Sequence, residues 1–272
     1  MSKPLSNRSM YIRAFLGLYL RDLRVLSREL GPFILRVGMQ PLLFLFVFTY
    51  VFPRMSGGNP MAAASGPSFG TVLLPGLMAV AIMFSAIAAV ALPLSSEFGV
   101  TREIDDRVMS PLPVAGVAIE KICFGAMQSI IAALIVLPLA IYIPTTPVAA
   151  RVDHWFFAVL VLILSSLVAG ALGLAIGANV KPPQIGLVFS IVLVPITFLG
   201  CVYYPWSMLN RIPVLKWAVL LNPIVYMSEG LRTALTPDVP HMPWYVILLA
   251  LLISLYLLGR LGLRGFVRRV IS

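Results

Sequence analysis

Apolar residues occur along this chain in long runs, and six of the runs are long enough to cross a membrane as α-helices. A crossing helix needs about 20 mostly apolar residues to traverse roughly 30 Å of hydrocarbon. Charged residues, prolines or polar loops bound every run. The predicted spans cover about 33–52, 71–94, 119–142, 155–178, 185–204 and 244–261. The pattern therefore predicts an all-α, polytopic membrane protein with six transmembrane helices.

Residues 10–30 form an amphipathic segment ahead of the first predicted span. Apolar side chains recur there at helical spacing, and arginines line another face of the same helix. The apolar positions are Ile12, Phe15, Leu16, Tyr19, Leu23, Leu26 and Leu30, and the arginines are Arg13, Arg21, Arg24 and Arg28. An apolar stripe opposite a cationic face is typical of a helix that lies in the membrane interface. We predict such a helix here; a solvated basic tail is the alternative.

The stretch 205–243 decides how often the chain crosses the membrane. Its apolar part, 217–228, holds only 12 residues and is interrupted at Asn222-Pro223. A run of that length is typical of an interfacial or re-entrant segment. We expect a re-entrant helical hairpin over 205–236 before the last span. If this segment crossed instead, the chain would have seven spans and an external C-terminal tail.

Composition excludes several classes of protein. Hydrophobic residues make up 60% of the 272 positions and charged residues only 11%, whereas soluble domains carry roughly 25% charged residues. A soluble enzyme, a disordered chain and a secreted disulfide scaffold are therefore excluded. The net charge of +10 does not indicate nucleic-acid binding, because the Lys and Arg residues flank apolar runs and form no single basic face.

The distribution of Lys and Arg predicts the orientation. If the N-terminus is cytoplasmic, 15 of the 20 basic residues lie on the inner side of the six-span topology. The five on the outer side are Arg54, Arg151, Arg211, Lys216 and Arg232. Cytoplasmic loops carry an excess of Lys and Arg. We therefore expect both termini in the cytoplasm.

The chain shows no motif for chemistry of its own. It has no phosphate-binding loop for ATP, and we find no catalytic constellation, cofactor site or metal site. Cys123 and Cys201 lie in different apolar segments and are expected to stay free. No ionisable residue lies near the middle of a predicted span; Arg36, Glu120 and Lys121 lie at span ends. This absence argues against a proton-coupled transporter and leaves a sodium site built from unwound backbone open. The lack of clustered acids, bases or metal ligands disfavours a membrane-embedded enzyme.

Charged residues gather in the loop between the second and third predicted spans. They are Glu97, Arg102, Glu103, Asp105, Asp106 and Arg107. Thr101 is a candidate N-cap for a short helix, and the prolines at 111 and 113 would end that helix. The pattern indicates a short, charged helix facing the cytoplasm; a solvated connection is the alternative.

This arrangement resembles the membrane subunit of type-2 ATP-binding-cassette (ABC) exporters, and three stretches carry the likeness. They are LLPGLMAVAIMFSAI (73–87), EFGVTREIDDRVMSPLP (97–113) and FLGCVYYPWSMLNRIPVLKWAVLLNPIVYMSEGLRTAL (198–235). The resemblance covers nearly the whole chain. Each motif is degenerate alone, whereas their order and spacing together are more specific.

The resemblance implies a permease subunit that is not an enzyme by itself. Residues 1–32 would be a cytoplasmic tail and an elbow helix carrying the four arginines, and 33–272 would be a six-span domain in the inner (plasma) membrane. Loop 97–116 would be the coupling loop, contacting a separate ABC ATPase that binds ATP and Mg. The coupling residues would be Glu97, Thr101, Arg102, Glu103, Asp105, Asp106 and Arg107, and the outer hairpin residues Asn222, Pro223, Tyr226, Glu229 and Arg232.

The resemblance also implies a second copy of the chain, or a close homologue, around the substrate path. We expect export of a hydrophobic or amphiphilic substrate (drug-like, lipid or glycolipid), with membrane lipid and no nucleic acid as partners. An ion-coupled secondary transporter or channel without an ATPase is the alternative.

Two further patterns give testable geometry. Glu229 and Arg232 are spaced to form an i,i+3 ion pair, at the outer edge of the substrate path or simply stabilising the hairpin. The glycines Gly170, Gly173 and Gly177 in the fourth span allow close helix approach. Packing within one subunit is the favoured interpretation of these glycines, and a dimer contact is the alternative.

Overall fold

The computed structural model describes residues 7–51, 69–99, 112–143, 148–188, 191 and 194–271, and within them the protein is helical, with no strand. The α-helices are α1 (Asn7–Arg28), α2 (Leu30–Phe46), α4 (Phe69–Gly99), α6 (Val114–Tyr142), α7 (Trp155–Asn179), α8 (Ile185–Val188), α9 (Val194–Phe198), α10 (Pro213–Ala218), α11 (Pro223–Leu235) and α12 (Trp244–Ile271). Shorter turns of helix are η1 (Val47–Val51), η2 (Pro182–Gln184), η4 (Trp206–Arg211) and η5 (Val219–Leu221). The all-α prediction is confirmed.

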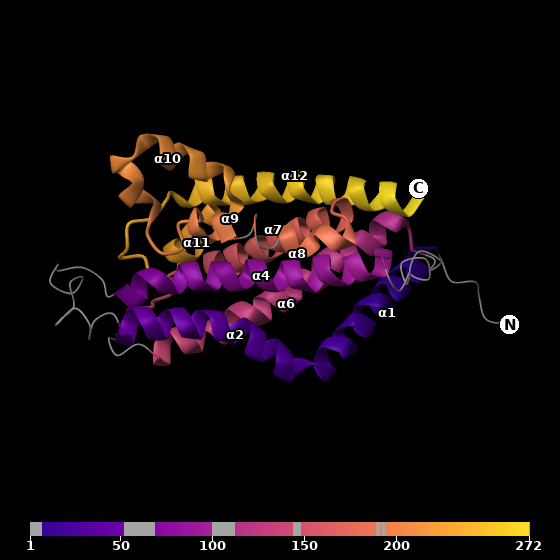
Figure 1. The fold of residues 1–272 in the computed structure, drawn as a ribbon, viewed down its shortest axis with the longest axis horizontal. Coiled ribbons are helices and arrows are strands. Elements are labelled where there is room, and N and C mark those ends of the chain that lie inside the picture. The colour runs from indigo at the N-terminus through magenta and orange to yellow at the C-terminus, as the bar shows by residue number, and fades with distance from the viewer. Residues whose placement is uncertain are drawn as a thin grey trace.

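Four long helices, α4, α6, α7 and α12, lie side by side along the long axis of the molecule (Figure 1). Each is long and apolar enough to cross a membrane. They coincide with the predicted spans at 71–94, 119–142, 155–178 and 244–261, whose crossing of a membrane stays a prediction. The first predicted span corresponds to α2 continued by η1. The start of α1 and the end of α12 lie at the same end of the bundle (Figure 1), as the six-span topology requires.

The fifth predicted span is not one continuous helix as far as residue 204. Residues 189, 190, 192 and 193 lie outside the described residues; α8 precedes them, α9 follows them, and α9 ends at Phe198. Cys201 then adopts a positive φ of 52°, a left-handed conformation that terminates helices. The prediction was wrong at this end because glycine usually marks a left-handed turn in a sequence, and here the residue is a cysteine.

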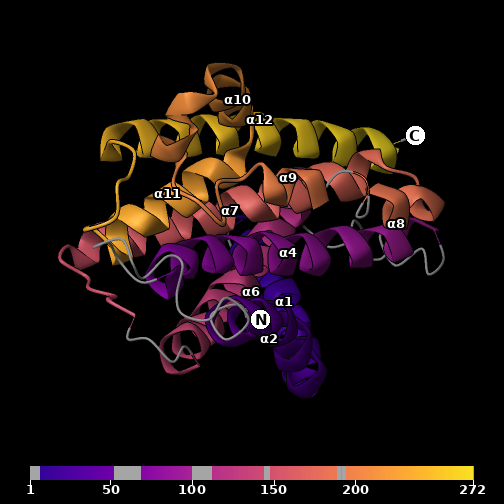
Figure 2. The ribbon, with the colours of Figure 1, turned by 60° about the vertical axis from the view of Figure 1, so that its left-hand side comes forward.

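The bundle is layered, with α4 at its centre. In Figure 2, α12 lies near the top, α7 and then α4 and α6 lie beneath it, and α1 and α2 lie at the bottom. In the most apolar part of α4, 78% of residues are buried, against 17% in α12. The outer face of α12 is therefore free to contact lipid or another protein.

Glycines on α7 allow the central helices to approach closely. A Cβ at Gly170 would lie 2.7 Å from the Ile122 carbonyl of α6, and one at Gly177 would lie 3.0 Å from the Cα of Ala91 on α4. Gly173 meets α4 in the same way, 3.1 Å from the Cα of Ile87. The prediction that these glycines serve packing within one subunit is confirmed.

The N-terminal segment forms the predicted helix, α1, which bends by 76° into α2. Phe15, Tyr19 and Leu26 pack against the bundle, whereas Ile12 and Leu16 are exposed. Part of the apolar stripe is therefore available to lipid. Its location in the membrane interface stays a prediction.

The outer end of α4 depends on Gly76. A Cβ there would overlap the carbonyl oxygen of Val202, which no non-bonded contact permits. We expect Gly76→Ala to destabilise the protein by about 1–3 kcal/mol or more, because backbone must move to admit the methyl group. Thermal unfolding of the purified protein in detergent measures this. Gly259→Ala is the matched control, since a Cβ there meets nothing within 4 Å; equal melting temperatures for both variants would contradict the prediction.

Candidate functional site

A buried cluster of three charges joins α1, α4 and α6, and we call it the inner cluster. Lys121 Nζ donates to Glu97 Oε1 at 2.9 Å and to Asp22 Oδ2 at 3.2 Å. The side chains of Lys121, Glu97 and Asp22 are 2%, 5% and 9% exposed. Two acids around one buried amine satisfy the requirement that buried charges be paired.

The inner cluster spans both ends of the predicted coupling loop. Glu97 lies in the last turn of α4 and Lys121 in the second turn of α6. Asp22 reaches them from α1, on the same helical face as Tyr19 and Leu26. The two helices that flank the loop, α4 and α6, are thus connected to each other and to α1.

Two sequence assignments change at this end of the bundle. Glu97, assigned to the loop, is buried within α4, and Lys121, assigned to the mouth of a span, is buried within α6. Both helices extend further toward the loop than their apolar runs. α4 continues to Gly99, with Glu97 neutralised by Lys121, and α6 begins at Val114 with the uncharged residues 114–118. The other predicted coupling residues, Thr101, Arg102, Glu103, Asp105, Asp106 and Arg107, lie outside the described residues.

The sequence reading did not identify Asp22 as a site residue. The available signal was an acid on the apolar face of an arginine-rich helix, spaced three and four residues from Tyr19 and Leu26. The predicted elbow arginines Arg13, Arg24 and Arg28 are exposed, and Arg21, also exposed, lines a cavity beside the inner cluster.

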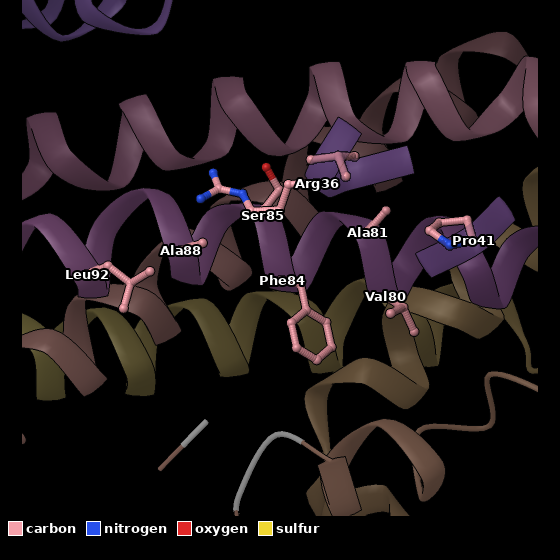
Figure 3. Close-up of a pocket in the computed structure, with 9 residues that line it drawn as sticks. Arg36, Pro41, Val80, Ala81, Phe84, Ser85, Ala88 and Leu92 are labelled. Carbon is pink, nitrogen blue, oxygen red and sulfur yellow. The ribbon is translucent and has the colours of Figure 1, made fainter. Parts of the chain in front are cut away.

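Two adjoining cavities open between α1–α2 and α4–α6, and together we call them the elbow cleft. The wider, of about 590 Å³, is lined by charged residues that include Arg21, Asp22, Glu29, Arg36, Glu97 and Lys121. The narrower, of about 200 Å³, is mostly apolar and lies between α2 and α4 (Figure 3). Arg36, Ala88 and Leu92 line both cavities, so the elbow cleft has one polar part and one apolar part.

A second buried ion pair lies toward the opposite end of the bundle, and we call it the outer clasp. Glu229 and Arg232 on α11 form the predicted i,i+3 pair, and both side chains are fully buried. Arg232 Nη2 also donates to the carbonyl oxygen of Cys201 at 3.2 Å. Glu229 accepts backbone N–H groups from Trp206 and Met242, each at 3.0 Å.

The outer clasp joins α11 to the segments that precede and follow it. Cys201 and Trp206 lie on the connection after α9, and Met242 lies just before α12. The left-handed conformation of Cys201 lies in the turn after α9. The carbonyl oxygen of Cys201 accepts a hydrogen bond from the Arg232 guanidinium. Sequence spacing predicted the pair but not its burial.

The remaining hairpin residues form the turn between two helical arms. The Asn222 side chain caps α11 by accepting from Ile224 N at 3.1 Å, and it donates to the Ile196 carbonyl at 2.6 Å. Pro223 is the first residue of α11, a position that suits proline. The Tyr226 hydroxyl donates to the Leu220 carbonyl at 2.8 Å. Short helices, α10 and η5, thus precede Asn222 and α11 follows it, whereas the re-entrant hairpin and its depth in a membrane stay predictions.

Neither cluster resembles a catalytic or metal site. The described residues contain no group of three or more His, Cys, Asp or Glu side chains that could hold a metal ion. Cys123 and Cys201 are free, as expected. The polar contacts of the inner cluster and the outer clasp connect helices near both ends of the bundle.

Comparison with known proteins agrees with this architecture. Residues 14–236 match the family described as ABC-2 type transporter. The chain is 27% identical over 241 residues to the inner membrane transport permease YadH of Escherichia coli strain K12, covering 85% of this chain and 90% of the relative. The protein of the same name from Shigella flexneri is similar to the same extent. The match covers α2, α4, α6, α7 and α11 in full and most of α1, and the chain therefore belongs to the ABC-2 type transporter family.

Proposed function

We propose that this chain is the inner-membrane permease subunit of an exporter driven by ATP hydrolysis on a separate subunit. The single observation that carries the proposal beyond family membership is the inner cluster. It connects both ends of loop 97–116 to each other and to α1. A force applied to the loop by an ATPase would reach three helices at once through Lys121.

The coupling step follows from the stiffness of this connection. Because Glu97 and Lys121 are held together, a movement of either end of the loop would be shared by α4 and α6. α4 is the most buried of the long helices and extends to the region of the outer clasp. Movement of its inner end can therefore be transmitted to the opposite end of the molecule, where α11 is attached.

The substrate we propose is hydrophobic or amphiphilic. Both α1 and α12 expose large apolar side chains, among them Leu16, Leu20, Leu252 and Leu257, so a hydrophobic or amphiphilic molecule can reach the protein from the bilayer. A second copy of the chain, or a close homologue, would complete the substrate path. The cytoplasmic location of both termini follows from the excess of Lys and Arg at the end where α1 begins and α12 ends.

Charge reversal in the coupling loop tests the proposed function. We expect the combined change of Glu103, Asp105 and Asp106 to Lys to weaken ATPase binding by about tenfold or more, since like charges then face each other across an interface. Co-purification of the ATPase and substrate-stimulated hydrolysis in proteoliposomes are the measurements.

Arg264 and Arg268, exposed on α12, supply the control when both are changed to Glu. Arg269 is not suitable, because its guanidinium donates to the Val180 carbonyl at 3.0 Å and stacks on Phe98. Wild-type binding and coupling in the loop variant would overturn the proposal. Substrate transport without any ATPase would instead identify an ion-coupled transporter or channel.

A further inference from the structure

The elbow cleft has the form of a site for a molecule with a charged head and an apolar tail. Its narrow part is lined by Val37, Pro41, Val80, Ala81 and Phe84. Its wide part carries acids and bases of both signs. α2 packs mainly on α6 and only sparsely on α4, which leaves the narrow part between α2 and α4 unfilled by protein.

Arg36 lies where the two parts meet. Its side chain extends along α4, past Ser85 and toward Ala88 (Figure 3). In the part of the chain that the structure describes, Arg36 has no ion pair or hydrogen bond. Arg36 is exposed at the mouth of the elbow cleft, and Asp22 and Glu97, the acids of the inner cluster, already hold Lys121. The Arg36 guanidinium is therefore available to an anionic group beside the apolar surface of α4.

We infer that the elbow cleft binds one membrane phospholipid, with its phosphate against Arg36 and an acyl chain in the narrow part. A guanidinium binds phosphate through paired, charge-assisted hydrogen bonds. Glu29, at the bend between α1 and α2, lines the wide part and suits the ammonium group of a zwitterionic head. A free phosphate ion would leave the apolar part empty, whereas a lipid occupies both parts.

The surroundings of the elbow cleft favour a lipid over a protein segment. The helix that bounds its wide part, α1, exposes Ile12, Leu16, Leu20 and Val25. A lipid can therefore enter sideways from the bilayer without leaving an apolar environment. This inference concerns lipid binding alone, and it does not depend on ATP coupling or on export.

Photolabelling of the full-length protein in lipid nanodiscs tests the inference. The probe is phosphatidylethanolamine with a diazirine on one acyl chain, and mass spectrometry locates the labelled residues. We expect labels on α2 and on residues 80–92 of α4. Arg36→Gln should reduce this labelling by about tenfold or more, because it removes a charge-assisted bond to phosphate.

Matched variants separate the phosphate contact from general folding. Arg36→Lys keeps the charge and should retain most of the labelling, and Arg264→Gln, on an exposed site, should not change it. Ala88→Phe fills the junction of the two parts while keeping Arg36, and should abolish labelling. A diacylglycerol with the same diazirine chain lacks phosphate and should label residues 80–92 weakly.

Three results would overturn the inference. They are full labelling of Arg36→Gln, equal labelling of wild type by the diacylglycerol, and disulfide formation between Ala88→Cys copies that eliminates lipid labelling. The last result would identify a second copy of the chain as the occupant.

Discussion

Replacing Arg232 with leucine is expected to destabilise the outer end of the protein by about 3–5 kcal/mol, because the change leaves the Glu229 carboxylate buried without its countercharge. The outer clasp also loses the hydrogen bond from Arg232 to the carbonyl of Cys201. Release of that carbonyl should free the connection between α9 and α11. The loss of stability is measured by unfolding the purified protein in detergent with heat or with denaturant.

The double variant Glu229→Leu/Arg232→Leu distinguishes charge from packing. Removing both members of a buried pair is often far less harmful than removing one, so the double variant should be more stable than Arg232→Leu. Arg151→Leu is the surface control. It breaks the pair with Asp153, in which the arginine side chain is 70% exposed, and surface pairs contribute little. Equal melting temperatures for the Arg232 and Arg151 variants would contradict the role we assign to the outer clasp.

Helix α7 illustrates what the sequence could determine. Its predicted limits, 155–178, agree with Trp155–Asn179 because a polar loop precedes it and Lys181 with two prolines follows it. The apolar run of α7 is thus bounded by strong signals at both ends. Its glycines also predicted close packing, because small residues at helical spacing indicate a close approach whichever helix is the partner.

Helix α12 shows a boundary that hydrophobicity alone misplaces. The apolar run ends near residue 261, whereas the helix continues to Ile271. Phe266 is fully buried against the bundle, with its ring 5.8 Å from that of Phe98, and Arg269 binds carbonyls at the end of α7. These contacts stabilise the ten further residues of the helix. Each contact is with another helix or its end, so the apolar pattern of α12 alone could not predict it.

The inner cluster was beyond the reach of sequence for the same reason. Asp22, Glu97 and Lys121 are separated by 75 and 24 positions, and none forms a motif with the others. Only the bend between α1 and α2 brings Asp22 to α6. The outer clasp was accessible because its two members lie three residues apart on one helix.

Replacing Lys121 with methionine is expected to impair coupled transport strongly while leaving the protein inserted in the membrane. The change places the carboxylates of Asp22 and Glu97 together in a buried site without a cation. Loss of one partner from a buried charge cluster costs about 3–5 kcal/mol, and the simplest relief is separation of α1 from α4 and α6. The coupling loop would then move without carrying α1 with it.

The measurement is transport per ATP hydrolysed, in proteoliposomes that contain the permease with its ATPase. Lys121→Met should lower this ratio by about tenfold or more, because loss of the shared cation from the buried cluster separates α1 from the ends of the loop. Lys121→Arg keeps the cation and should retain coupling. Transport per ATP equal to wild type in Lys121→Met would contradict a coupling role for the inner cluster.

The triple variant Asp22→Asn/Glu97→Gln/Lys121→Met separates stability from transmission. It removes all three charges, so little repulsion remains and the melting temperature should recover toward wild type. The ion pairs that tie α1 to the ends of the loop are also gone. If the inner cluster only stabilises the fold, coupling should recover together with stability. If the cluster transmits the movement of the ATPase, the triple variant should be stable and still uncoupled, which is the result we expect.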